Sequence, residues 1–121
     1  MSLADKEKFF AIGLGTKDVP IPELGPDVFI RVRALTGAER DRYETSLWIE
    51  RKGKQKLNLE DATAKLVVMS CINEDGSPYF GDDEVYSLSK KVGAKILKRL
   101  ADAAKELSGI TEEEQEELLK N

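Results

Sequence analysis

The side chains best placed to do chemistry lie in the stretch Asn73–Gly76, which is followed by a further acid at Asp82. Their oxygen atoms follow part of the pattern of an EF-hand calcium loop, in which the sixth position is a glycine. When Gly76 is aligned with that glycine, Cys71 falls on the first ligand position and Pro78 lies inside the loop. Neither residue suits a hard cation that takes oxygen ligands. The sequence therefore favours a plain Asp-Gly turn over a calcium site.

Catalytic groups are sparse. The chain has no histidine, the residue that serves most often as a general base and as a transition-metal ligand. The run Asp82–Glu84 offers paired carboxylates, but it begins a predicted helix, where acids are favoured by the helix dipole. Gly13-Leu-Gly15 lacks the third glycine of a phosphate-binding loop. We therefore predict that the protein is not an enzyme and binds no metal or cofactor.

Composition indicates one soluble domain. The chain has 121 residues, of which 40% are hydrophobic and 35% charged. This is enough to form a modest core without stabilising disulfides or metal ions. The net charge of −4 gives no overall attraction to nucleic acid or to an anionic membrane. No apolar run approaches the roughly 20 residues of a membrane span. The single cysteine, Cys71, is predicted to be a small buried hydrophobe, which favours a cytosolic setting.

A basic face is expected on a long helix predicted for Lys90–Leu107. Its members are Lys91, Lys95, Lys98 and Arg99. Nucleic-acid binding would call for neighbouring aromatic residues or a helix-turn-helix frame, and instead Asp102 and Glu106 continue the same face. A solvated helix face is favoured. A generic helical adaptor or regulator that binds nucleic acid through this face is the alternative hypothesis for function.

A central helix is predicted immediately before the Asn73–Gly76 turn and would position its side chains. The stretch Leu59–Ile72 is apolar around most of a helical rod, which is typical of a helix packed on several sides. Asn58 is a candidate N-cap. The helix is predicted to end at the Asn73–Gly76 turn, after which Tyr79 and Phe80 fold back near its end.

Two strands precede that helix. The segment Lys17–Pro22 contains two prolines, so it can form only an edge or irregular strand. The segment Asp27–Leu35 alternates clearly and is predicted to pair with it as an N-terminal hairpin. The predicted core face carries Val28, Ile30, Val32 and Ala34, and the outer face carries Phe29, Arg31 and Arg33. Because two strands alone are marginal in water, the hairpin must rest on helices.

The remaining segments complete the predicted architecture. Helices are expected over Ser2–Phe10, Gly37–Trp48, Asp82–Leu88, Lys90–Leu107 and Glu112–Leu119. Capping boxes are predicted at Thr36–Glu39 and Thr111–Glu114, and a glycine C-cap at Gly109, followed by Ile110. A flexible basic loop is predicted over Ile49–Leu57. The fold class is α+β: a mostly helical single domain over residues 1–121, with the hairpin packed on about four to five helices. Residues 1–16 are expected to be flexible.

The order of these elements resembles that of a known family. The stretches VPIPELGPDVFIRVRALTGAERDRYE and KLVVMSCINEDGSPYF, and the segment from Asp82 onward, are similar to tail assembly chaperones of long-tailed bacteriophages and prophages. The similarity spans about residues 17 to 121. Its most telling pieces are Leu35–Arg40, the turn before Phe80, and Leu107–Glu112. These are structural motifs, so they specify a fold better than an activity.

The resemblance implies a function and a set of partners. Such chaperones bind the long tape measure protein and keep it soluble while tail tube subunits assemble around it, and they do not remain in the virion. It implies a place in the cytoplasm of the bacterial host, with the tail tube protein and self-association as further candidate interactions. It supplies no catalytic residues. Candidate partner-binding anchors are Trp48, Ile49, Leu118 and Leu119, although each is equally expected to pack on its own core.

Overall fold

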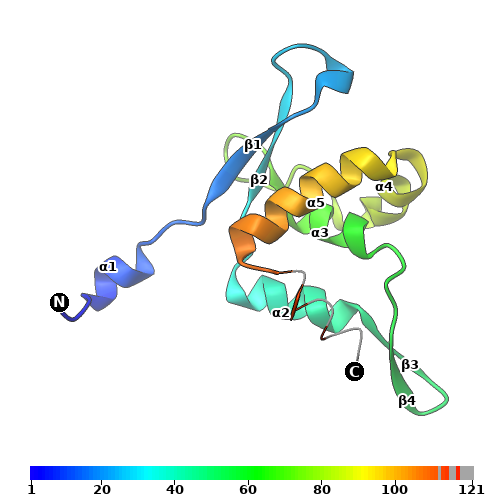
Figure 1. Cartoon of the computed structure of the whole chain (residues 1–121), viewed down its shortest axis with the longest axis horizontal. Coiled ribbons are helices and arrows are strands. Elements are labelled where there is room, and N and C mark those ends of the chain that lie inside the picture. Colours follow the sequence, from blue (N-terminus) through cyan, green and yellow to red (C-terminus); the bar gives the residue numbers. More distant parts are fainter. Residues whose placement is uncertain (112, 115–116, 118–121) are drawn as a thin grey trace.

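The computed structural model describes residues 1–111, 113–114 and 117. The helices are α1 (Lys6–Phe10), α2 (Gly37–Ser46), α3 (Ala62–Ser70), α4 (Val85–Lys91) and α5 (Ala94–Ser108); the strands are β1 (Thr16–Pro20), β2 (Phe29–Arg33), β3 (Trp48–Arg51), β4 (Lys54–Leu57) and β5 (Cys71–Ile72); and short 3₁₀ turns cover Pro22–Leu24 and Asp82–Glu84. Figure 1 shows this order. The predicted α+β fold with an N-terminal hairpin is confirmed.

The hairpin is part of a three-stranded sheet with the order β1-β2-β5. β1 and β2 are antiparallel, with Val19 opposite Ile30. β5 joins the other edge of β2, where Cys71 lies opposite Val32. The prediction that the central helix continues through Ile72 was wrong, because α3 ends at Ser70. Strand pairing there satisfies main-chain groups that a final helical turn would leave without partners.

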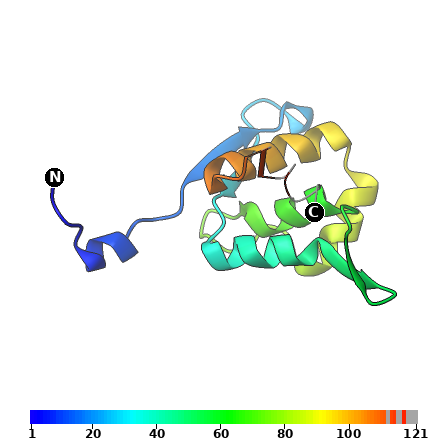
Figure 2. The same ribbon diagram turned by 60° about the horizontal axis from the view of Figure 1, so that its bottom comes forward.

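The core forms where α3 and α5 pack against each other and against the sheet. Leu66 and Val67 of α3 are fully buried, as is Val32 of β2. α5 adds Leu100 and Ala104 at the same contact. The two views of the ribbon agree that α3 lies between α2 and α5 (Figures 1 and 2). The central position predicted for this helix is therefore confirmed.

The predicted core face of β2 is only partly correct. Val32 is buried and Ile30 half-buried, but Val28 is exposed. The strand begins at Phe29, and the tip of the hairpin rises above α5 in Figure 1. Val28 is therefore beyond the helices that would cover it. An ion pair between Arg99 of α5 and Glu23, at 2.9 Å, ties the tip to the body.

The long helix is shorter than predicted at its start. Val92 has extended backbone angles and Gly93 is the N-cap, so α5 begins at Ala94 and Lys91 belongs to α4. The predicted C-terminal end is confirmed. Gly109 has a φ of 70°, and the Ile110 N–H donates to the Lys105 carbonyl at 2.9 Å. These are features of a Schellman ending, and Ile110 is buried beside the helix end.

A second hairpin replaces the predicted flexible loop. β3 and β4 pair in antiparallel register with Trp48 opposite Leu57, so the loop prediction for Ile49–Leu57 was wrong. Lys52 and Gly53 both have positive φ, at 53° and 74°, which is the conformation of a two-residue type I′ turn. The backbone twist of a type I′ turn matches the right-handed twist of the two strands that it connects. α2 consequently ends at Ser46, and Trp48 begins β3.

The N-terminal helix stands away from the rest of the protein. Asp5, and not Ser2, caps α1 by accepting a hydrogen bond from the Glu7 N–H. None of its residues is buried, and both views show it at the end of an extended segment (Figures 1 and 2). That residues 1–16 are flexible stays a prediction.

Candidate partner-binding site

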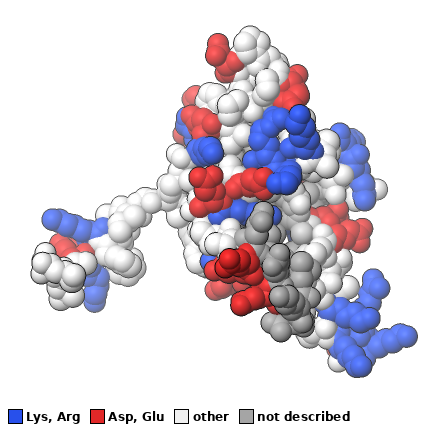
Figure 3. Space-filling model, in the orientation of Figure 1, with Lys and Arg blue, Asp and Glu red and all other residues white. Residues whose placement is uncertain are grey.

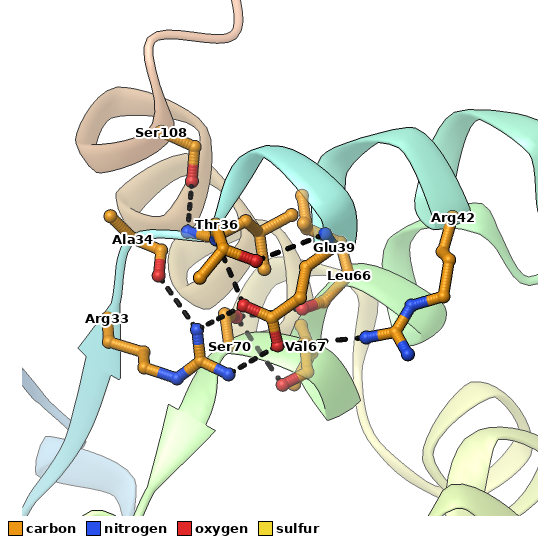
Figure 4. Close-up of polar contacts among 10 residues, drawn as sticks. Arg33, Ala34, Thr36, Glu39, Arg42, Leu66, Val67, Ser70 and Ser108 are labelled. Carbon is orange, nitrogen blue, oxygen red and sulfur yellow. Dashed lines mark hydrogen bonds and ion pairs between the residues drawn. The ribbon is translucent and has the colours of Figure 1, made fainter. Parts of the chain in front are cut away.

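One ion pair fixes how the sheet leads into α2. The Arg33 guanidinium donates to both carboxylate oxygens of Glu39, at 2.7 and 2.6 Å. The same carboxylate accepts the Thr36 N–H at 2.9 Å, and the Thr36 hydroxyl accepts the Glu39 N–H at 3.2 Å. This is the predicted capping box (Figure 4). Sequence analysis placed Arg33 on the outer face of the sheet and missed its ion pair with Glu39. This ion pair holds α2 at a fixed angle to β2.

The electrostatics of Glu39 follow from these contacts. The hydrogen bonds from Arg33 lower the pKa of Glu39 to about 2, and the Thr36 N–H acts in the same direction against the effect of burial. The carboxylate is therefore ionised across the physiological range. At the same junction the Leu35 N–H donates to the Ser108 hydroxyl at 2.9 Å, which joins the end of α5 to the start of α2 (Figure 4).

The predicted anchors Trp48 and Ile49 lie together on β3, and both are half-buried. Because they are consecutive residues of a strand, they lie on opposite faces. Trp48 shares its face with Leu57, while Ile49 lies opposite Lys56. The structure therefore does not combine them into one apolar surface. The other two predicted anchors, Leu118 and Leu119, lie outside the described residues.

An apolar groove of about 200 Å³ lies beside the base of the second hairpin. It is lined by Tyr43, Glu44, Leu47, Leu57, Leu59, Ala62, Thr63, Lys105, Ile110 and Glu114. Tyr43 of α2 and Leu47, the C-cap residue of that helix, are both buried where they line the groove. The groove combines residues from α2, β4, α3 and the end of α5, so no local sequence pattern could have revealed it.

Two exposed apolar surfaces were missed by sequence analysis. The N-terminal arm carries Phe9, Phe10, Ile12 and Leu14, and the tip of the first hairpin carries Leu24, Val28 and Phe29. Phe10 is 79% exposed and Leu24 is 68% exposed. The signal for the arm was an aromatic pair in a helix too short to bury it. The signal for the tip was a leucine within a turn sequence that also contains prolines.

The segment compared with a calcium loop is a closed turn. Gly76 has a φ of 87°, and its N–H donates to the Asn73 carbonyl at 3.0 Å. The Asp75 carboxylate accepts both the N–H and the hydroxyl of Ser77, at 3.0 and 2.5 Å. These contacts fit the predicted Asp-Gly turn. Within residues 1–111, 113–114 and 117, no group of three or more acidic, histidine or cysteine side chains could hold a metal ion.

The other chemically capable groups have structural surroundings. Cys71 is buried, and burial raises the pKa of its thiol to about 12, so the reactive thiolate is not formed near neutral pH. The predicted basic face is divided: Lys91 lies on α4, Lys98 pairs with Asp102 at 2.6 Å, and Arg99 pairs with Glu23. Lys95, Lys98 and Arg99 remain on α5, and the ion pairs of Lys98 and Arg99 with acids fit the predicted solvated face.

In the part of the chain that the structure describes, no helix combines the length and apolar character needed to cross a bilayer.

The comparisons with known proteins bear on the fold. No protein-family model and no curated protein matches the chain. Among solved structures, the chain is similar to the tail assembly chaperone of bacteriophage HK97, with a TM-score of 0.58 and 20% sequence identity. The match covers 84% of this chain and 90% of that chain. The protein therefore has the fold of a tail assembly chaperone, as the sequence resemblance implied.

Proposed function

We propose that this protein is a phage tail assembly chaperone, which binds the tape measure protein and keeps it soluble while the tail tube assembles. The observation that carries the proposal is the fold shared with the HK97 tail assembly chaperone over 84% of the chain. In this proposal the protein is not an enzyme and acts in the cytoplasm of the bacterial host. Contact with the tail tube protein and self-association are further parts of the proposal.

The surface has features that suit such a client. A long helical protein that has not yet assembled exposes apolar stripes, and apolar side chains on a chaperone can cover them. The N-terminal arm and the tip of the first hairpin both present apolar side chains to solvent. A surrounding surface rich in charge keeps the complex in solution. Several copies bound along one client would add avidity to weak individual contacts.

Co-expression with the tape measure protein of the same phage tests the proposal. We expect the soluble fraction of the client to rise and the two proteins to co-purify. Trp48→Ala and Ile49→Ala are expected to reduce capture, with Tyr86→Ala as the matched control because Tyr86 is an exposed aromatic residue on α4. If the client stays insoluble and nothing co-purifies, the proposal is wrong.

A melting curve for each variant separates lost binding from lost folding. Ile49→Ala and Trp48→Ala remove half-buried side chains, so a moderate fall in melting temperature is expected for both. Each variant is compared with a variant elsewhere in the protein whose melting temperature falls by the same amount. If the Trp48 or Ile49 variant captures less client than that reference variant, the side chain belongs to the interface. Equal loss of capture and stability would assign it to the core of the second hairpin.

A further inference from the structure

The second hairpin concentrates positive charge in a protein whose net charge is −4. Arg51, Lys52, Lys54 and Lys56 are all exposed, and Glu50 is the only acid on β3, β4 or the turn between them. In the space-filling view these strands form a basic projection at the lower right (Figure 3). None of the four cations forms an ion pair with another residue in the described part of the chain.

The register of the hairpin gathers these charges on one face. Arg51 lies directly opposite Lys54, and Ile49 lies directly opposite Lys56. Opposed residues share a face, and every second residue of a strand lies on that face too. One face therefore carries Ile49, Arg51, Lys54 and Lys56, which we call the cationic face. The opposite face carries Trp48 and Leu57, the latter a lining residue of the apolar groove.

The cationic face works against the stability of the hairpin. Like charges directly opposite each other on two strands are destabilising, and Arg51 and Lys54 are such a pair. A two-stranded hairpin is only marginally stable to begin with. A charge arrangement that weakens a marginal element, without internal counter-ions among the described residues, is one that an external anionic partner would stabilise.

We propose that the cationic face binds an acidic segment of the client, with Ile49 contacting an apolar side chain of that segment. This inference rests on the proposed function and deepens it, because it names the chemistry of the client segment. Electrostatic attraction would steer the client to the hairpin, and the apolar surfaces would then hold it. The anchor role predicted for Ile49 is thereby placed within a charged contact.

A protein segment fits this face better than a nucleic acid does. Single-stranded nucleic acid is usually held by aromatic side chains that stack on bases. The aromatic residue of the hairpin, Trp48, lies on the opposite face and is half-buried.

A charge-neutralised variant tests the inference. The variant carries Arg51→Gln, Lys54→Gln and Lys56→Gln, and its matched control carries Lys90→Gln, Lys91→Gln and Lys95→Gln, which are exposed lysines of α4 and α5. Both lose the same charge. Binding is measured to the full-length tape measure protein of the same phage and to overlapping synthetic peptides that tile its sequence.

We expect the peptides that bind best to carry net negative charge, and the hairpin variant to bind them about tenfold more weakly than the control, as expected for the loss of several exposed ion pairs. Affinity of the unmodified protein should fall between about 0.1 and about 1 M salt, where the Debye length shrinks from about 10 to about 3 Å. The hairpin variant should lose this salt dependence. Its melting temperature should be unchanged or higher, because the repulsion between Arg51 and Lys54 is removed.

Other outcomes would overturn the inference. If the unmodified protein and the hairpin variant capture the client equally, the cationic face is not used, and the proposed function stands. If the unmodified protein captures no client, the proposed function and this inference fail together. Salt-sensitive self-association lost in the hairpin variant would assign the face to a second copy of the chain. Tight binding of a single-stranded oligonucleotide, with no peptide bound, would assign it to nucleic acid.

Discussion

The Arg33 guanidinium and the Glu39 carboxylate form a two-pronged ion pair across the junction of β2 and α2, with nitrogen-to-oxygen distances of 2.7 and 2.6 Å. Parallel hydrogen bonds of this kind add geometric specificity as well as energy. Glu39 is also the second half of the capping box with Thr36. One carboxylate thus sets both where α2 begins and how it is oriented on the sheet.

Substitution of Glu39 should separate these two roles. Glu39→Gln keeps an oxygen that can accept the Thr36 N–H but loses the charge that pairs with Arg33, and we expect it to cost about 1 kcal/mol. Glu39→Ala loses both and should cost roughly 2–3 kcal/mol. Asp41→Asn is the matched control, because Asp41 is exposed on the same helix, and should cost under about 0.5 kcal/mol. Urea denaturation measures all three, and equal costs for the two Glu39 variants would contradict the split.

The same carboxylate should make stability depend on pH. The pKa of Glu39 falls from 4.5 to about 2 in the folded protein, so its contribution is complete above about pH 5 and is lost as the pH falls toward 2. The free energy of unfolding of the protein and of Glu39→Gln should therefore converge over that window. Glu23, whose pKa Arg99 also lowers to about 2, affects both proteins equally and cancels in the difference. A difference that stays constant from pH 6 to about 2 would contradict the assignment.

A buried main-chain donor at the start of α2 depends on Ser108. Leu35 is buried, and its N–H donates to the Ser108 hydroxyl at 2.9 Å. Ser108→Ala leaves this donor without its acceptor and should cost about 1–3 kcal/mol. Ser87→Ala, at an exposed position of α4, is the control and should be nearly neutral. Hydrogen exchange at the Leu35 amide should accelerate in the first variant only, and unchanged protection there would show that another acceptor replaces the hydroxyl.

The sequence predicted the parts of this fold that local chemistry determines. The capping box at Thr36 and Glu39 and the glycine ending at Gly109 need only neighbouring residues, and both are present. The apolar character of α3 likewise indicated a central helix, because it is read from neighbouring residues alone. Long-range pairing was not predictable in this way. Nothing between Ser70 and Asn73 signals that β2 offers an unpaired edge to Cys71 and Ile72.

The candidate site shows the same division. Trp48 and Ile49 were identified by residue type, but their faces depend on the register of a hairpin that was predicted to be a loop. The positive φ of Lys52, a residue that turn statistics do not favour there, hid the type I′ turn. The exposure of Leu24 and Phe29 depends on how far α5 reaches along the sheet, and no pattern within either segment carries that information.

Large-to-small substitutions should confirm the core contact between α3 and α5. Leu66 and Leu100 are 0% and 2% exposed, so Leu66→Ala and Leu100→Ala should each cost roughly 2–5 kcal/mol through lost burial and a residual cavity. Leu24→Ala is the control of identical chemistry at an exposed position. It should change the free energy of unfolding by under about 0.5 kcal/mol. If denaturant melts show that each core variant lowers the free energy of unfolding by less than about 1 kcal/mol, the contact between α3 and α5 is not tightly packed.

The tip of the first hairpin should matter for client capture and not for folding. Leu24 and Phe29 are 68% and 44% exposed, so Leu24→Ser and Phe29→Ser remove little from the core. If the tip covers an apolar stripe of the client, each loses a contact of about 1–2 kcal/mol, which corresponds to roughly 5- to 30-fold weaker binding. The Arg99–Glu23 ion pair keeps the tip attached to α5 in both variants.

Tyr86→Ser, at an equally exposed position of α4, is the control for lost apolar surface. Capture of the tape measure protein is scored by co-purification at high salt, because that condition screens the cationic face and leaves apolar contacts in place. Weaker capture by the two tip variants, with melting temperatures unchanged, would assign the tip to the interface. Unchanged capture by both would leave the N-terminal arm, with Phe9 and Phe10, as the exposed apolar surface to substitute next.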